Sequence, residues 1–191
     1  WEAGSVQLHE VRTTGDKVQD RPLAEIGGKG LWTKELDQFL LAGTTQLSVH
    51  SCKDVESERP DNLCIAAFLP RADVRDRLIG ATSIDALSQG AKVGTSSPRR
   101  TAQLLRRRPD LQVSIMRGNV ATRLKHIADG NYEATFLAAA GLDRLGIDEG
   151  TAIEIDSFLP APGQAAIAIE CRTDDAETRA LLKAIDDEPT R

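Results

Sequence analysis

The chain has 191 residues and a mass of 20.7 kDa, and its 40% hydrophobic and 28% charged residues exclude a disordered or fibrous protein. Its 24 basic and 29 acidic residues give a net charge of −5, and only 4% of residues are aromatic, so nucleic-acid binding by the whole molecule is not expected. No apolar run approaches the ~20 residues of a membrane-spanning helix, and no signal peptide is visible at the start, so we expect no membrane partner.

The first third of the chain predicts strands around one helix. Ser5–Thr13 alternates in part between apolar and polar residues, which indicates a strand. Gly27–Gly30 forms a glycine-rich loop, and Thr33 can cap a helix that runs through Leu41. Two short apolar runs, Gln46–His50 and Leu63–Phe68, are typical of buried strands.

The middle of the chain alternates more regularly. Strands are predicted at Lys92–Thr95, Leu111–Met116 and Ala134–Ala138. Ser97 can cap a helix that ends near Arg108, and Asn119 can cap a second helix. This order of strand, helix and strand predicts an α/β fold with a mixed, mostly parallel sheet covered by helices.

The last segment begins at a proline-rich stretch, Pro160–Gly163. A strand is predicted at Gln164–Glu170, and an amphipathic helix from about Asp175. Pro160–Gly163 and Pro70–Asp73 are candidate hinges between two domains.

The charge is unevenly distributed along the sequence. The segment Ala91–Lys125 carries nine basic residues and one acid, a balance of +8, so the other 156 residues carry −5 − 8 = −13. A basic segment in an acidic chain indicates a local anion site. The run Arg106–Arg108 is better explained as a solvated helix end, where cations suit the helix dipole.

Arginines also occur at predicted helix starts, where the dipole favours acids. Arg99 and Arg100 follow Ser97 directly, and Arg117 and Arg123 flank the start of the second helix. Backbone N–H groups beside guanidinium groups can bind carboxylate or phosphate. The alternative is that these arginines pair with acids of the chain itself. Further candidates for the anion site are the hydroxyls and lysines of Thr95, Ser96, Ser97, Lys29 and Lys34.

A single carboxylate is the second chemical feature. Asp54 follows a predicted buried strand that ends in His50 and Ser51, so it lies near the edge of a sheet. Beside a cationic pocket, it could bind a ligand N–H, stabilise a developing cation or transfer a proton. The alternatives are an ordinary loop aspartate that caps a turn, and a His50 that is a packed residue rather than a base.

The chain resembles the porphobilinogen deaminase (hydroxymethylbilane synthase) family through six motifs in order. These are Gly27–Leu31, Val49–Val55, Val93–Arg100, Arg117–Leu124, Leu137–Gly146 and Pro160–Gln164.

The resemblance implies two domains similar to type II periplasmic binding proteins, with an active cleft between them. Residues 1–69 and 166–191 would form domain 1, and residues 70–165 would form domain 2. It also implies a transferase that joins four molecules of porphobilinogen into hydroxymethylbilane, releasing ammonia each time. The chain grows on a covalently held dipyrromethane cofactor, without a metal, in a cytoplasmic enzyme that is a monomer.

The resemblance also implies roles for individual residues. Asp54 would be the catalytic carboxylate, and Lys29 and Lys34 would lie on a substrate loop near the cleft. The cofactor and substrate carboxylates would be bound by Ser51, Lys53, Thr95, Ser96, Ser97, Arg99, Arg100, Arg117, Gly118, Arg123, Gln164 and Ala165.

Several features depart from the family pattern. The cysteine that anchors the cofactor belongs to a third domain, and Cys52, Cys64 and Cys171 do not match it, so we expect this chain alone to be inactive. Three widely spaced cysteines predict neither a disulfide framework nor a metal site, and favour a reducing compartment. Ala165 stands where the family usually has glycine. The alternative function is a receptor-like binding module for a small polyanion, which would not need Asp54.

Overall fold

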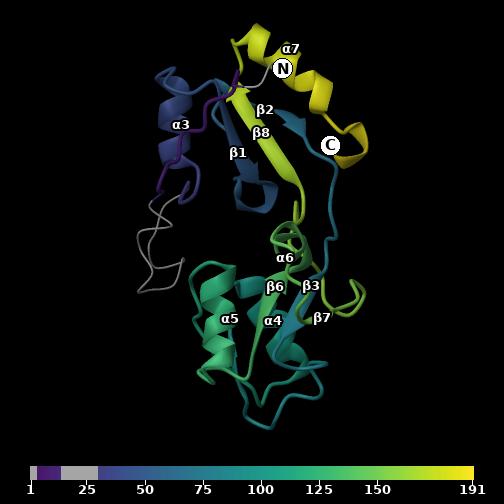
Figure 1. Ribbon diagram of the computed structural model, residues 1–191. Coiled ribbons are helices and arrows are strands. Elements are labelled where there is room, and N and C mark those ends of the chain that lie inside the picture. Colours follow the sequence, from purple (N-terminus) through teal and green to yellow (C-terminus); the bar gives the residue numbers. More distant parts are fainter. Residues whose placement is uncertain (1–3, 14–29) are drawn as a thin grey trace. The chain divides into compact units, whose positions relative to one another are not determined.

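A computed structural model describes residues 4–13 and 30–191, which divide into two compact units (Figure 1). Of the described residues, 4–13, 30–70 and 167–191 form unit 1, and 71–166 form unit 2. Each unit is considered by itself. Within these ranges, every helix is too short or too polar to cross a lipid bilayer.

Unit 1 is built on a three-stranded sheet in the order β1-β8-β2, and both strand pairs are antiparallel. The mostly parallel sheet that the sequence predicted is therefore wrong for this unit. The central strand β8 returns to unit 1 only after the chain has passed through unit 2. The elements of unit 1 are α3 (Lys34–Leu41), β1 (Leu47–Ser51), the 3₁₀ turn η1 (Cys52–Asp54), β2 (Leu63–Phe68), β8 (Ile167–Arg172), α7 (Ala176–Leu182), η2 (Lys183–Ile185) and η3 (Glu188–Thr190).

The two faces of this sheet differ in polarity. On one face, Ile169 and Cys171 of β8 pack against Leu182 of α7 in an apolar cluster. Because side chains alternate along a strand, Glu170 points to the other face, together with His50 of β1. Both side chains are buried, so this second face has a polar core.

Unit 2 contains a five-stranded mixed sheet in the order β5-β4-β6-β3-β7. The strands β5, β4 and β6 are parallel, as predicted, whereas β3 pairs antiparallel with β6 and β7. The elements of unit 2 are β3 (Asp76–Ile79), β4 (Lys92–Gly94), α4 (Pro98–Arg107), β5 (Gln112–Ser114), α5 (Val120–Ala128), β6 (Ala134–Ala138), α6 (Ala139–Arg144) and β7 (Thr151–Ala152).

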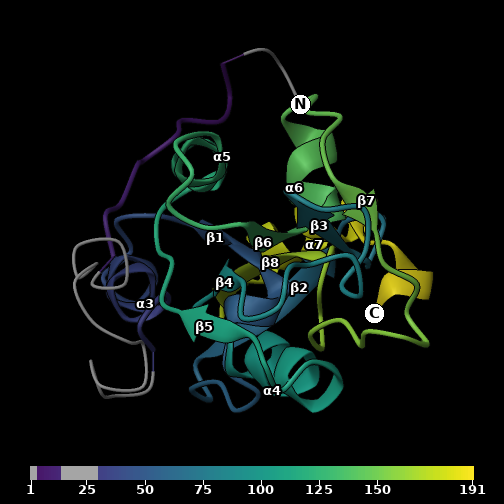
Figure 2. The ribbon, with the colours of Figure 1, turned by 90° about the horizontal axis from the view of Figure 1, so that it is seen from below.

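Helices cover both faces of this sheet (Figure 2). Phe136 and Leu78 pack with Leu104 of α4 on one face. Their neighbours Leu137 and Ile79 belong to a separate cluster with apolar residues of α5 and α6 on the opposite face. The two-residue period of β6 and β3 thus assigns each helix to its face.

Two predicted helix starts are confirmed by their caps. The side chain of Ser97 accepts a hydrogen bond from the Arg100 N–H, and that of Asn119 accepts one from the Thr122 N–H. Thr33 precedes α3 but does not cap it, since its hydroxyl instead donates to Glu56 Oε2 at 3.0 Å.

Other elements differ from the sequence prediction. Ser5–Thr13 is irregular and mostly exposed rather than a strand, because it joins neither sheet. The strands β3 and β7 were not predicted. The predicted strand Gln164–Glu170 begins later, at Ile167, because Gln164 and Ala165 form a turn.

Ala165 is the only non-glycine residue with a positive φ in the described part of the chain, with φ of 72°. It is buried, and its carbonyl accepts a hydrogen bond from Arg144 Nη2 at 3.0 Å. A side chain is unfavourable in this left-handed region because its Cβ approaches the following carbonyl. The turn that leads into β8 is therefore strained.

We expect Ala165→Gly to raise the free energy of unfolding by about 0.5–1 kcal/mol, because the relief of strain exceeds the added entropy of the unfolded chain. Urea unfolding of both proteins measures the change. Ala161→Gly, in the same loop but without a positive φ, is the matched control and should be destabilising. An equal loss of stability in both variants would contradict the strain at Ala165.

Candidate active site

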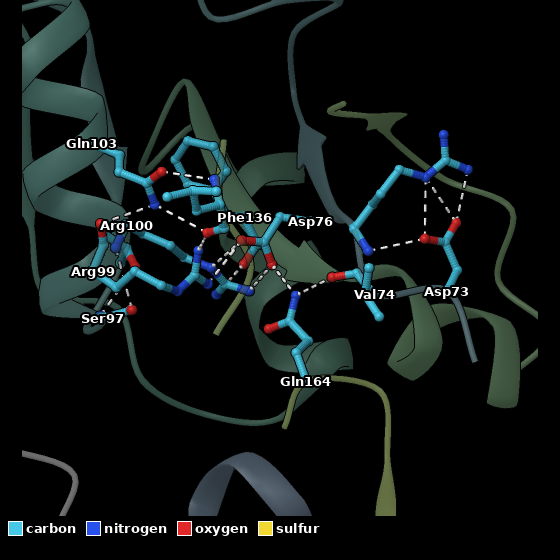
Figure 3. A network of polar contacts seen from close by, with 12 residues as sticks. Asp73, Val74, Asp76, Ser97, Arg99, Arg100, Gln103, Phe136 and Gln164 are labelled. Atoms are coloured by element: carbon cyan, nitrogen blue, oxygen red, sulfur yellow. Dashed lines mark hydrogen bonds and ion pairs between the residues drawn. The ribbon is translucent and has the colours of Figure 1, made fainter. Parts of the chain in front are cut away.

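Asp76, at the start of β3, is a fully buried carboxylate that binds two arginines of α4 (Figure 3). Arg100 Nη2 donates to its Oδ1 at 2.6 Å, and Arg99 Nη2 donates to its Oδ2 at 2.8 Å. Two of the predicted anion-binding arginines are therefore paired with an acid of the chain itself. This is the alternative that the sequence left open.

Further hydrogen bonds connect this carboxylate to three more segments. Arg100 Nη1 donates to the Phe136 carbonyl of β6 at 2.9 Å. Gln164 Nε2 donates to Asp76 Oδ1 at 3.0 Å and to the Val74 carbonyl at 2.7 Å. Gln164 Oε1 and Arg99 Nε are buried and lack a hydrogen-bond partner among the described residues. Asp76 thus holds the start of α4, β6 and the Gln164 turn together, and the network retains these two buried polar atoms without a hydrogen-bond partner among the described residues.

The Asp76 carboxyl is ionised in this arrangement. Burial alone raises the pKa of Asp76, but the hydrogen bond and charge of Arg100, with those of Arg99, outweigh it and lower the pKa below its usual value. Breaking such a buried pair leaves an uncompensated charge.

A second cationic group lies at the start of α5. Arg123 Nε donates to the Gly118 carbonyl at 2.9 Å. Gly118 has φ of +105°, and a Cβ there would lie 2.8 Å from the Thr122 side chain, so this close turn requires glycine. Burial, followed by the positive charges of Arg100 and Arg117, lowers the pKa of Arg123. No carboxylate of the described residues forms an ion pair with Arg123, so positive charge is in local excess here.

The three hydroxyls before α4 shape its start. Thr95 is buried and its Oγ1 accepts from the Ser97 N–H at 3.2 Å, while Ser96 Oγ donates to the Met116 carbonyl at 2.8 Å. Ser97 caps the helix. These side chains fix the loop between β4 and α4, whose backbone precedes Arg99 and Arg100.

The Asp54 segment belongs to unit 1. Ser51 ends β1, and Lys53 and Asp54 lie in η1, with all three side chains at the surface. Protein atoms packed around the Asp54 carboxyl raise its pKa, and the charges of Lys53 and His50 oppose that rise. Lys34 is exposed at the start of α3, and Lys29 lies outside the described residues.

The structure thus brings together two sets of predicted residues within unit 2. Arg99, Arg100 and Gln164 meet at Asp76, and Gly118 and Arg123 meet at the start of α5. Sequence reasoning missed Asp76 itself. No clear signal in the sequence marks it, since Asp76–Ile79 begins with two charged residues before Leu78 and Ile79. Within residues 4–13 and 30–191, no group of three or more histidine, cysteine, aspartate or glutamate side chains could hold a metal ion.

The donor set of unit 2 fits a ligand with several carboxylates. A guanidinium carries five N–H donors. The hydrogen bonds to Asp76 and to the carbonyls of Leu159, Phe136 and Gly118 leave part of those of Arg99, Arg100 and Arg123 unused. The local excess of positive charge around Arg123 favours an anion.

The sequence matches a protein-family profile over most of its length. The profile described as porphobilinogen deaminase, dipyromethane cofactor binding domain, matches residues 2–180. The chain belongs to the porphobilinogen deaminase family. The porphobilinogen deaminase of Sphingopyxis alaskensis is 54% identical over 97% of this chain, and that of Brevibacillus brevis is 49% identical over 97%. The chain spans 61% of the length of each of these relatives.

Solved structures support the α/β fold alone. A periplasmic substrate-binding protein from Coxiella burnetii matches 81% of the chain with a TM-score of 0.51 and 14% identity, and 76% of that protein is covered. This likeness agrees with the expected similarity of the fold to type II periplasmic binding proteins.

We expect Asp76→Asn to destabilise unit 2 by about 3–5 kcal/mol, because it leaves the buried Arg100 and the half-buried Arg99 without their counter-charge. Urea unfolding followed by the NMR signals of Tyr132, the single tyrosine of the chain, measures this loss. Asp85→Asn, which breaks the exposed pair with Arg107, is the matched control and should cost much less. Equal losses would contradict an organising role for Asp76.

The same pair makes the stability of unit 2 depend on pH. Because the folded pKa of Asp76 lies below its unfolded value of about 3.9, its contribution is complete above that value. It is lost as pH falls through the lower folded pKa. Unfolding measured from pH 6 to pH 2 should therefore show a smaller acid loss in Asp76→Asn than in the parent protein. Parallel curves would contradict this linkage.

Proposed function

We propose that the full-length protein is a transferase that polymerises four porphobilinogen molecules into hydroxymethylbilane and releases ammonia at each condensation. Membership of the family over residues 2–180 is the observation that carries this proposal. The excess positive charge in unit 2 supports it, since porphobilinogen and its oligomers carry acetate and propionate side chains.

We propose that unit 2 binds the carboxylates of the dipyrromethane cofactor and of the growing chain. Arg123 carries a positive charge that forms no ion pair with a carboxylate of the described residues. Arg117 lies close enough for its charge to act on Arg123. Arg99 and Arg100 provide the N–H groups that Asp76 leaves unused, and Ser96 and Ser97 provide backbone and hydroxyl donors. When bound, dipyrromethane supplies the pyrrole carbon to which the first substrate molecule is joined.

We propose that Asp54 is the catalytic carboxylate. Ammonia leaves when the C–N bond of the substrate aminomethyl group breaks, and positive charge develops on the methylene carbon and its ring. An ionised Asp54 stabilises that charge and accepts a hydrogen bond from the pyrrole N–H. A new C–C bond then forms, and the attacked pyrrole carbon loses its proton. The raised pKa of Asp54 suits transfer of that proton.

We also propose that this chemistry takes place in the cytoplasm on a monomer. Cys52, Cys64 and Cys171 are all free thiols, which supports a reducing compartment.

We expect Asp54→Asn in the full-length protein to lower kcat for ammonia release by at least about 100-fold, because it removes the charge while keeping the shape. Cofactor content, measured by the colour with Ehrlich's reagent, should stay unchanged. Asp61→Asn, an exposed aspartate of the following loop, should leave kcat unchanged. Turnover near the parental value in Asp54→Asn would remove the catalytic assignment.

We expect Arg123→Leu to reduce cofactor loading by about 10-fold or more, because one charge-assisted carboxylate contact is lost. Mass spectrometry of the purified protein measures the loaded fraction. Arg106→Leu, which removes an exposed arginine of α4, is the matched control and should load normally. Full cofactor loading of Arg123→Leu would show that this arginine has only a structural role.

A parent protein that binds porphobilinogen without releasing ammonia would favour the receptor-like alternative.

A further inference from the structure

The polar face of the unit 1 sheet contains a buried network centred on Arg59, here called the Arg59 network. Arg59 Nε and Nη2 donate to the two carboxylate oxygens of Glu170 at 2.8 Å each. Arg59 Nη1 donates to Glu56 Oε2 at 2.8 Å, and Nη2 also donates to Asp37. The arginine therefore links β8 and α3 to the 51–60 loop that contains Asp54.

The charges in this network do not balance around the arginine. Three carboxylates, from Glu170, Glu56 and Asp37, surround one guanidinium, and the Glu170 side chain is fully buried. Burial raises the pKa of Asp37, and after the opposing effect of Arg59 the negative charges of Glu170 and Glu56 raise it further. The site therefore favours a second cation.

His50 lies where that cation is needed. Its buried ring places Nε2 at 3.2 Å from Glu170 Oε2, a contact with the geometry of an ion pair rather than of an aligned hydrogen bond. Arg59 donates to both oxygens of the same carboxylate, including the Oε2 that the ring contacts, which fixes the position of Glu170 against the ring.

The position of His50 in the chain connects this network to Asp54. His50 is the penultimate residue of β1, and Asp54 ends the single turn that follows. Burial acts to raise the pKa of Glu170, but contacts with His50 and Arg59 outweigh it and lower that pKa. The pKa of Asp54 is raised by the protein atoms around its carboxyl, and Lys53 and His50 oppose that rise. Lys53 is the other cation that acts on Asp54. The charged groups that act on Asp54 are thus Lys53 and His50, and those that act on Glu170 are Arg59 and His50.

We propose that Arg59, Glu170 and His50 are positioning residues for Asp54. Arg59 secures the loop to β8 and α3, Glu170 holds the ring of His50, and His50, next to last in β1, positions the turn that ends in Asp54. This proposal rests on the catalytic role proposed for Asp54. None of the three residues needs to touch the substrate.

The first test replaces His50 by glutamine in the full-length protein. With the His50 ring removed, its lowering effect on the pKa of Asp54 is lost, so the acid limb of the kcat profile moves to higher pH. At the pH optimum of the parent protein, kcat should fall about 10–100-fold while KM changes less than about threefold, as for a misplaced reacting group. His126→Gln, a histidine of α5 in unit 2, is the matched control and should leave both the profile and kcat unchanged.

A second measurement does not depend on turnover. The NMR titration of the Asp54 carboxyl carbon, assigned by its loss in Asp54→Asn, should move to higher pH in His50→Gln and stay in place in His126→Gln. An unmoved titration would overturn the proposal even if activity fell. If the titration moves in His50→Gln but the parent protein releases no ammonia, the link between His50 and Asp54 stands and the proposed catalytic function is removed.

A third variant tests the anchor and remains informative if His50→Gln does not fold. Arg59→Lys keeps one positive charge but loses the fork that contacts three carboxylates. We expect kcat to fall about 10-fold or more, with cofactor content unchanged and faster hydrogen exchange confined to residues 51–60. Arg107→Lys, at an exposed pair of α4, should change neither. Parental kcat and exchange in Arg59→Lys would overturn the role of the anchor.

Discussion

Each unit depends on a buried carboxylate that is compensated mainly by arginine. Asp76 in unit 2 and Glu170 in unit 1 have no exposed surface, and each accepts two short hydrogen bonds from arginine. Moving an unpaired carboxylate out of water costs several kcal/mol, so any other position of the arginines would be strongly destabilising. The pairs therefore specify where α4 begins relative to β3, and where the 51–60 loop lies relative to β8.

This constraint separates the arginines of unit 2 into two kinds. Arg99 and Arg100 are held by Asp76, so their remaining N–H groups have fixed directions before any ligand arrives. Arg123 is half-buried and repelled by Arg100 and Arg117. Such a site favours binding of a ligand carboxylate for two reasons. The fixed arginines lose little conformational entropy on binding, and the positive charge of Arg123 is not yet paired.

The sequence predicted the features that rest on local patterns. The parallel strands of unit 2 and the caps Ser97 and Asn119 follow from residue spacing and cap chemistry, and the structure confirms them. The antiparallel pairing in unit 1 could not be predicted in this way, because it joins β1 and β2 to a strand more than 100 residues away. Nor could Ser5–Thr13, whose alternation is that of a strand although it joins no sheet.

The candidate site shows the same division. The positions of Arg99, Arg100, Arg117 and Arg123 at predicted helix starts, where the dipole disfavours cations, identified them as unusual. The sequence alone does not show which acid lies opposite each arginine. Asp76 is more than 20 residues from either of its arginines, and Glu170 is 111 residues from Arg59. Asp76 stands beside another charged residue at the start of its strand, whereas Glu170 is a charged residue inside the apolar strand Ile167–Arg172, which was an available signal. That pattern indicates that a buried partner exists, and only the fold identifies it.

The two networks also differ in the sign of their surplus charge, which gives the uneven distribution of charge along the sequence a structural meaning. Around Arg59, three carboxylates exceed the arginine, and the adjoining segment presents Asp54. Around Arg123, guanidinium groups exceed the acids of the described residues. Under the proposed function, the positive field binds the carboxylates of the substrate and the negative field stabilises the cation that develops. Each field has its own buried framework. Asp76 and Arg59 are the centres of these two frameworks.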